Sequence, residues 1–214
     1  MSSFLSGLKR IAVFASGFGS NLQALIDSQN KNYFNGKIVL VFSNNESAYA
    51  IQRAKNSNIK TECFLLSDFN SRSDFDKKII YMLKENNIDL IVLAGYMLLL
   101  GEEVIKQYRY KILNIHPALL PAFKGTHGIK DAFDYGVKVT GVTVHFVDEG
   151  LDSGPIILQE PVIIEDNDTL ETLEEKIHKV EHKMYPYAVK LFCENRLLVE
   201  GRRVKIVDVN KPID

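Results

Sequence analysis

Short apolar runs alternate with helix-forming segments through the first half of the chain, and this alternation is the strongest constraint on its fold. The runs contain many β-branched residues and are apolar on both faces, as expected of parallel strands covered on both sides. They span 10–15, 37–42, 60–65, 90–94 and 112–115. The segments with helical spacing span 21–28, 49–56, 71–86 and 102–107. The pattern therefore predicts an α/β fold in which helices cross a parallel sheet.

The second half predicts two further strands and a long helix. The extended runs 139–147 and 155–164 are separated by a segment rich in turn formers, which is typical of a β-hairpin-like excursion. A helix at about 169–193 would carry one buried stripe, made of Leu173, Ile177, Val180 and Met184. Since no repeat or linker divides the chain, we expect a single domain with a Rossmann-like, doubly wound and mostly parallel sheet. The expected boundaries are an N-terminal extension at 1–8, the domain at 9–200 and a C-terminal tail at 201–214.

Composition argues against several classes of protein. The 26 Lys and Arg residues nearly balance the 27 Asp and Glu residues, so a nucleic-acid partner is not expected. The sequence has neither a secretory signal nor an apolar stretch long enough to cross a membrane, so we expect a cytoplasmic protein without a membrane partner. Cys63 and Cys193 lie far apart and form no Cys-x-x-Cys, which suggests neither a disulfide framework nor a cysteine zinc site.

A glycine-containing loop follows the first predicted strand and opens the first predicted helix, at 16–22. Gly17 and Gly19 allow a tight turn, and Ser20 and Asn21 are residue types common at helix N-caps. Free N–H groups at such a helix start would bind a phosphate. Two alternatives are a dinucleotide fingerprint, although its third Gly is missing, and a turn that only joins strand to helix. A nucleoside-triphosphate P-loop is not indicated, because Lys-Ser/Thr is absent after the glycine.

Polar residues gather at the end of the fifth predicted strand. Alternation along the strand puts Asn114 and His116 on the same side, where an amide donor and an imidazole could hold an oxyanion and transfer a proton. Acyl transfer to an amine requires both functions. The alternative is a hydrogen-bonded His with a structural role. Further along, a strand that carries Thr143 and His145 leads to Asp152 in a sharp turn, and a carboxylate near His116 would favour the imidazolium.

Three motifs together closely resemble the glycinamide ribonucleotide formyltransferases, over roughly residues 9 to 200. They are Gly19-Ser20-Asn21-Leu22, Asn114-Ile115-His116-Pro117-Ala118-Leu119-Leu120-Pro121 and Leu151-Asp152-Ser153-Gly154-Pro155-Ile156-Ile157-Leu158-Gln159. The resemblance implies an enzyme of purine synthesis that moves a formyl group from 10-formyltetrahydrofolate, its co-substrate, to the amine of glycinamide ribonucleotide. It also implies small-molecule substrates, no metal, and a monomer or a homodimer.

The resemblance also implies roles for individual residues. The catalytic residues would be Asn114, His116 and Asp152, supported by Thr143 and His145. The ribonucleotide would be bound by Gly19, Ser20, Asn21, His178, Lys179, Val180 and Glu181. The folate would contact Arg72, Met97, Leu98, Leu99, Leu100, Asn114, Asp148, Glu149, Gly150, Leu151 and Asp152. Family members often carry Arg at the position of Leu98, so a side-chain contact with the folate would change there, whereas a backbone contact would survive.

Other functions were weighed against this one. A methionyl-tRNA formyltransferase shares the Asn, His and Asp motifs, but its family has a C-terminal tRNA-binding domain that we do not expect here. The stretch 178–182 spells H-x-x-E-H, the inverted zinc-peptidase signature, but a polar helix flank is favoured because the resemblance already assigns that segment. A non-enzymatic folate or nucleotide binder is the remaining alternative.

Overall fold

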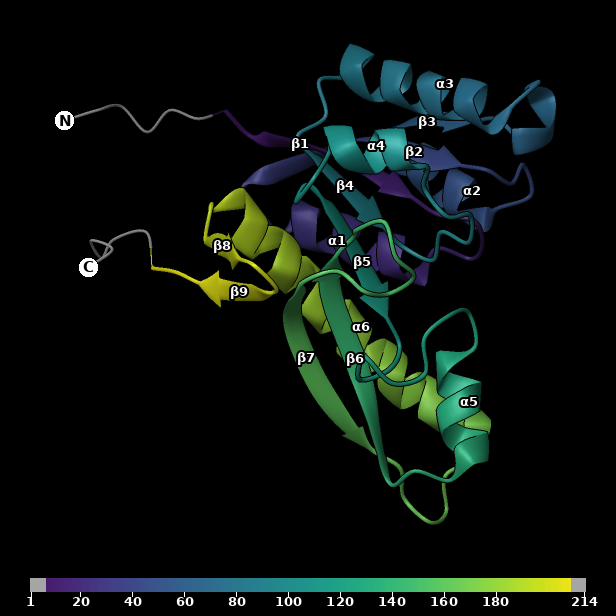
Figure 1. Cartoon of the computed structure of the whole chain (residues 1–214), viewed down its shortest axis with the longest axis vertical. Coiled ribbons are helices and arrows are strands. Elements are labelled where there is room, and N and C mark those ends of the chain that lie inside the picture. The colour runs from purple at the N-terminus through teal and green to yellow at the C-terminus, as the bar shows by residue number, and fades with distance from the viewer. Residues whose placement is uncertain (1–6, 209–214) are drawn as a thin grey trace.

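The computed structural model describes residues 7–208, and within them nine strands form one sheet in the order β3-β2-β1-β4-β5-β6-β7-β9-β8 (Figure 1). The strands are β1 Lys9–Phe14, β2 Gly36–Ser43, β3 Lys60–Cys63, β4 Leu90–Leu93, β5 Ile112–His116, β6 Val139–Phe146, β7 Ile156–Ile163, β8 Leu197–Glu200 and β9 Arg203–Ile206. The α-helices are α1 Ser20–Asn30, α2 Tyr49–Asn56, α3 Arg72–Glu85, α4 Glu102–Gln107, α5 Gly128–Tyr135 and α6 Leu170–Cys193. This architecture confirms the predicted α/β fold with a mostly parallel sheet.

The parallel half of the sheet contains β1 to β5. β1 pairs in parallel with both β2 and β4, while β3 extends the sheet beyond β2 and β5 extends it beyond β4. The chain therefore winds outward from β1 in one direction and then returns to wind in the other. A crevice opens at such a reversal, beyond the carboxyl ends of the strands, and ligands of doubly wound sheets bind there.

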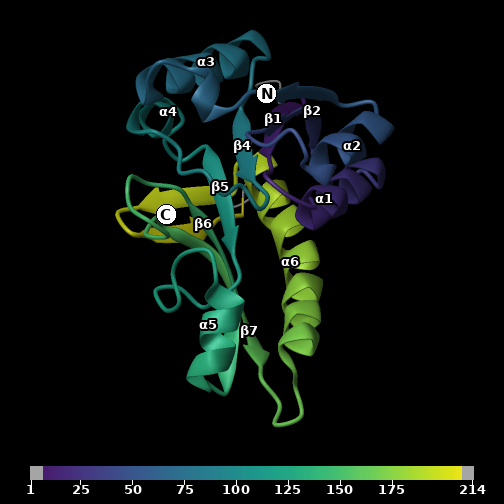
Figure 2. The same ribbon diagram turned by 90° about the vertical axis from the view of Figure 1, so that its right-hand side faces the viewer.

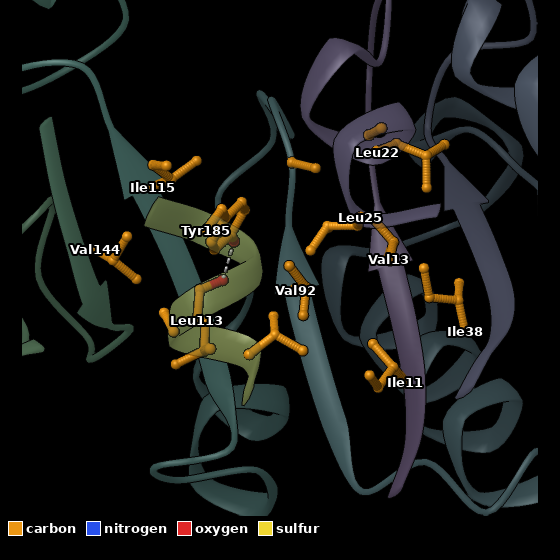
Figure 3. Packing of buried hydrophobic residues seen from close by; sticks show 14 of the residues in the cluster. Ile11, Val13, Leu22, Leu25, Ile38, Val92, Leu113, Ile115, Val144 and Tyr185 are labelled. Carbon is orange, nitrogen blue, oxygen red and sulfur yellow. Dashed lines mark hydrogen bonds between the residues drawn. The ribbon is translucent and has the colours of Figure 1, made fainter. Parts of the chain in front are cut away.

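Helices cover both faces of the parallel half. Figure 2 shows α1, α2 and α6 on one side of the sheet and α3 and α4 on the other. Alternate residues of one strand enter different cores: Ile11 and Val13 pack under α1 and α6 (Figure 3), whereas Ala12 and Phe14 pack under α3. This explains why the predicted strands at the centre of the sheet are apolar on both faces, since helices cover both faces there, whereas the edge strand β3 is partly exposed.

The second half of the sheet is mostly antiparallel; among the described strands of this half, β7 and β9 pair in parallel. β5 pairs with β6, and β6 pairs with β7, in the antiparallel sense, which confirms the predicted hairpin-like excursion. Helix α5 and strands β8 and β9 were not predicted from the sequence. β9 lies within the segment expected as a tail and pairs with β7 at Ile156 and Arg203, while the expected domain boundary itself stays a prediction. Residues 1–6 and 209–214 of the expected extension and tail lie outside the described residues.

Helix α6 packs against strands of both halves of the sheet. Thr169 caps its start, where the hydroxyl accepts a hydrogen bond from the amide of Thr172 at 3.3 Å. Of the predicted stripe, Leu173, Ile177 and Met184 are buried and Val180 is partly buried against the same core. Among the described residues, no helix is both long enough and apolar enough to cross a membrane.

The hydroxyl of Tyr185 joins α6 to the strands that carry the polar motifs. This fully buried side chain donates to the carbonyl oxygen of Leu93 at 2.7 Å and to that of Leu113 at 3.0 Å, the second of which is drawn in Figure 3. Leu93 ends β4, and Leu113 precedes Asn114 on β5. The hydrogen bonds thus fix the helix against the two strands at the edge where the crevice opens.

Replacing Tyr185 with Phe should lower the free energy of unfolding by about 1–3 kcal/mol, because a buried hydrogen-bond donor is lost while its acceptors stay buried. Urea unfolding followed by circular dichroism would measure the loss. The matched control is Tyr187→Phe, which removes a hydroxyl from the same helix at a partly exposed position. Equal losses in the two variants would contradict the role given to Tyr185.

Candidate active site

One cavity of about 540 Å³ opens beyond the carboxyl ends of β1, β4 and β5. It is lined mainly by the glycine loop at 16–21, the segment 93–100, the end of β5, the turn 147–152, and the α6 side chains His178 and Glu181. Ile105, His145 and residues 125–126 also line it. The cavity therefore brings all three sequence motifs to one place. This location agrees with the reversal of strand order between β1 and β4.

The glycine loop points amides toward the cavity from the start of α1. Gly19 has a φ of 75° and is the N-cap residue, so our assignment of Ser20 and Asn21 as cap residues was wrong by one or two positions. Glycine is needed there because the backbone is left-handed and a Cβ would approach that of Ala50 to 2.8 Å. Ser20 and Asn21 instead occupy the first turn, beside the free N–H groups that favour an anion.

The register of β5 against β6 assembles the polar cluster. Asn114 lies opposite His145, and His116 lies opposite Thr143. Opposed residues of an antiparallel pair project to the same face, so four polar side chains share one side of the sheet. On the other side, the alternating residues such as Ile115 lie in the core under α6. The predicted placement of Asn114 and His116 on one side is thus confirmed.

Asp152 meets this cluster from the turn after β6. Its backbone has a φ of 46°, and its carboxylate accepts a hydrogen bond from the amide of Gly125 at 2.8 Å. One carboxylate oxygen lies 3.5 Å from Nδ1 of His116, and the other lies 3.5 Å from Nδ2 of Asn114. The three residues predicted to be catalytic are therefore within reach of one another, although each contact is longer than an ideal hydrogen bond.

His145 orients the amide of Asn114. Its Nδ1 lies 2.8 Å from the carbonyl oxygen of Phe146, and because a carbonyl can only accept, Nδ1 carries the hydrogen. Burial lowers the pKa of His145, which favours the neutral ring and leaves Nε2 as an acceptor. Nε2 lies 3.2 Å from Nδ2 of Asn114, so the amide must turn its NH2 group toward His145. The second N–H of that group then faces Asp152 and the cavity.

The loop after β5 closes over His116. Nε2 of His116 donates to the carbonyl oxygen of Phe123 at 2.7 Å, and the side chain is 3% exposed. Thr143 supports this loop from below, donating to the carbonyl oxygen of Ala118 at 2.6 Å and accepting from the amide of Leu120 at 3.1 Å. Both nitrogens of the imidazole consequently have a neighbour, the carboxylate on one side and the loop carbonyl on the other.

A buried carboxylate connects α6 to the glycine loop. Glu181 is 4% exposed, accepts from Nδ2 of Asn21 at 3.1 Å and lies 2.8 Å from Nδ1 of His178. The hydrogen bond between His178 and Glu181 raises the pKa of His178 above its ordinary value. A zinc peptidase would need Glu181 as a free base, whereas here both of its neighbours bind it. Across residues 7–208, no group of three or more His, Cys, Asp or Glu side chains is arranged to hold a metal ion.

The apolar wall of the cavity comes from the segment after β4. Met97 and Leu99 are 62% and 65% exposed, and Leu98 and Leu100 also line the cavity. Arg72 lies behind this wall, where it pairs with Asp76 at 3.0 Å and donates to the carbonyl oxygen of Leu99. Of the residues singled out from the sequence, Arg72, Thr143, Lys179 and Val180 lie outside the cavity lining.

Two groups at the site were not found by sequence analysis. They are the carbonyl of Phe123, which holds His116, and the amide of Gly125, which holds Asp152. Both act through the backbone, so side-chain chemistry gives no signal for them. The one signal in the sequence was Gly125 itself, because a glycine in a loop allows its backbone amide to approach another group closely.

Comparison with known proteins agrees with this geometry. A family model described as formyl transferase matches residues 9–189. The phosphoribosylglycinamide formyltransferase of Bacillus subtilis is 44% identical over 183 residues, which cover 86% of this chain and 94% of that protein. The trifunctional purine biosynthetic protein adenosine-3 of Gallus gallus is 42% identical over 190 residues, which cover 89% of this chain but 19% of that longer protein.

A solved structure extends the similarity to three dimensions. The crystal structure of glycinamide ribonucleotide transformylase 1 from Symbiobacterium toebii has a TM-score of 0.93 and 41% sequence identity to this chain. The match covers 97% of this chain and 99% of that one. The sequence motifs, the cavity that unites them and these similarities lead to one conclusion: this chain belongs to the formyl transferase family.

Proposed function

We propose that this chain is a phosphoribosylglycinamide formyltransferase, which transfers the formyl group of 10-formyltetrahydrofolate to the amine of 5-phosphoribosylglycinamide in purine biosynthesis. The observation that carries the proposal is that one cavity contains both a phosphate-binding type of loop at Gly19 and the cluster of Asn114, His116 and Asp152. The first part suits an acceptor with a phosphate, and the second suits acyl transfer to an amine.

The two substrates would enter from different sides of the cavity. The ribonucleotide would extend from the glycine loop past Glu181, and the folate would lie between the apolar segment 97–100 and the turn 148–152. The formyl carbon and the amine then meet above the end of β5. Holding both reactants in attack geometry converts an encounter in solution into a unimolecular step, which lowers the barrier by several kcal/mol.

The transfer is direct. The amine nitrogen forms a bond to the formyl carbon, and the carbonyl electron pair moves to oxygen, which becomes an oxyanion beside Asn114 and His116. When the adduct collapses, the bond between the formyl carbon and N10 of the folate breaks. The amine loses a proton and N10 gains one, and His116, with Asp152 at its other nitrogen, is the group that we assign to this proton transfer.

His116 must change its hydrogen bonding in this mechanism. Its Nε2 donates to the carbonyl oxygen of Phe123, so that nitrogen can donate to the adduct only after the loop carbonyl moves away. The carboxylate of Asp152 lies 3.5 Å from Nδ1, the other ring nitrogen of His116. Asn114 turns its NH2 group toward His145, and the second N–H of that group, which faces Asp152 at 3.5 Å, is the donor that we assign to the adduct.

Another enzyme that uses 10-formyltetrahydrofolate is the alternative, and the acceptor distinguishes the two. Mixing the purified protein with 10-formyltetrahydrofolate and 5-phosphoribosylglycinamide should produce tetrahydrofolate, detected by its absorbance. No product with this acceptor, but product with water or a charged tRNA, would reject the proposal. A cytoplasmic location and a monomeric or homodimeric state also stay predictions.

Replacing His116 with Ala should lower kcat by about 100-fold or more, because the proton donor and one partner of the oxyanion are lost. Steady-state turnover of the purified variant measures the effect, and its melting temperature serves as the control for folding. A folded His116→Ala protein with turnover within a few-fold of the wild type would show that the assigned role is wrong.

Removal of the substrate phosphate should lower kcat/KM by about 100-fold, since each hydrogen bond to a charged group contributes roughly 1.5–3 kcal/mol and about 1.4 kcal/mol is a factor of ten. Glycinamide riboside is the test substrate. The variant Gly19→Val should cause a similar loss with the ribonucleotide, because a side chain cannot be accommodated at a φ of 75° against Ala50.

The folate KM is the internal control for both measurements and should change little. Equal reaction of riboside and ribonucleotide, or unchanged ribonucleotide affinity in Gly19→Val, would reopen the identity of the acceptor.

A further inference from the structure

We propose that Arg53, on α2, is a positioning residue that makes the glycine loop competent to bind the substrate phosphate. The inference rests on the proposed function, because it concerns the acceptor end of the same cavity. Arg53 stands outside the cavity lining and was not singled out from the sequence. It holds a carbonyl of the loop by a hydrogen bond and packs against an aromatic side chain of the loop, and its charge attracts the phosphate.

The carbonyl oxygens of residues 16–19 in the loop each accept a hydrogen bond from another part of the chain. That of Ser16 accepts from the side chain of Asn45 at 2.9 Å, that of Gly17 from the amide of Ala50 at 3.1 Å, and that of Gly19 from the amide of Gln23 at 3.0 Å. The carbonyl oxygen of Phe18 accepts from Nε of Arg53 at 2.9 Å.

These contacts leave the amides of the loop free. Within the part of the chain that the structure describes, the N–H groups of residues 17–21 donate to no acceptor. A peptide bond has its carbonyl and its N–H on opposite sides, so fixing the carbonyl of Phe18 away from the cavity also fixes the amide of Gly19. Three of the four carbonyls are held by backbone or by Asn45, and only that of Phe18 depends on a long cationic side chain.

An aromatic pair holds the guanidinium in place. The rings of Phe18 and Tyr49 stack with centroids 5.4 Å apart at an interplanar angle of 15°. The guanidinium carbon of Arg53 lies 4.5 Å from the Phe18 centroid and 4.9 Å from that of Tyr49, in cation–π contact with both. Its Nη1 also donates to the side chain of Gln23 at 3.1 Å. Four contacts therefore fix one flexible side chain, although Phe18 itself is 67% exposed at the cavity mouth.

Charge gives Arg53 a second effect on a phosphate. The loop itself supplies only uncharged groups, its N–H dipoles and the side chains of Ser20 and Asn21, and the buried carboxylate of Glu181 lies on the other side of Asn21, where it repels an anion. A fixed guanidinium directly behind the loop offsets that repulsion. Since the attraction acts on the phosphate and not on the reacting atoms, it should change binding of the ribonucleotide and leave the chemical step alone.

The test compares Arg53→Met with Lys55→Met. Both variants remove one positive charge from α2, but Lys55 is exposed and no contact joins it to the loop among the described residues. Arg53→Met should raise the KM for the ribonucleotide about tenfold or more, while kcat and the KM for 10-formyltetrahydrofolate stay within about twofold; a tenfold change corresponds to about 1.4 kcal/mol. Lys55→Met should leave all three constants within about twofold.

Two further measurements separate positioning from a general structural effect. With glycinamide riboside as acceptor, Arg53→Met and the wild type should react at the same kcat/KM, because no phosphate is present to be bound. Arg53→Lys keeps the charge but loses the planar fork that both stacks and donates, so its ribonucleotide KM should lie between those of the wild type and Arg53→Met.

Binding of ribose 5-phosphate, followed by calorimetry, makes the test independent of catalysis. The wild type should bind it, and Arg53→Met should bind it about tenfold more weakly. Failure of formyl transfer by the wild type would reject the proposed function while this comparison still tests Arg53. The inference about Arg53 is overturned if the wild type binds no ribose 5-phosphate or if Arg53→Met binds it as well as the wild type. It is also overturned if Arg53→Met lowers kcat/KM equally for the riboside and the ribonucleotide.

Discussion

The antiparallel register between β5 and β6 is the constraint on which the rest of the site depends. It sets Asn114 opposite His145 and His116 opposite Thr143, so that the amide is oriented and the loop above the imidazole is supported from the same strand. A slip of one residue would turn these side chains into the core and bring Val144 to the cavity. The alternating apolar residues under α6 prevent that slip, because burying polar groups there would cost several kcal/mol each.

The two halves of the sheet contribute different parts of the site. The parallel half ends in the glycine loop and the apolar segment after β4, which are binding surfaces made largely of backbone and hydrophobic side chains. The junction of the two halves, where β5 pairs with β6, contributes the side chains of the polar cluster, and the turn after β6 carries Asp152. Tyr185 joins α6 to β4 and β5 through the carbonyls of Leu93 and Leu113, so the position of the cluster relative to the loop is fixed by α6 and not by the cavity wall alone.

Most of the fold could be predicted from the sequence because burial on both faces leaves a clear pattern. The first seven strands and five of the helices follow such patterns. The glycine loop at 16–22 was predicted from its residue types and its place after β1, and the shared side of Asn114 and His116 from alternation along β5. The short helix α5 and the small strands β8 and β9 lack long apolar patterns, so their formation depends on contacts with the rest of the fold. The groups that hold His116 and Asp152 are backbone atoms, and Arg53 acts across two helices; such contacts depend on tertiary structure and leave no local signal.

The strand order also sets a length. β4 alone separates β1 from β5, and neighbouring strands are about 4.8 Å apart, so the glycine loop and the polar cluster stand about 10 Å from each other across the sheet. Side chains cannot alter that span, since hydrogen bonds of the ladder maintain it. The sheet therefore sets the length of the acceptors that fit. A molecule whose anionic and nucleophilic ends are much closer together or farther apart than this span can occupy only one end of the cavity. Redesign for such a molecule would have to begin with the backbone.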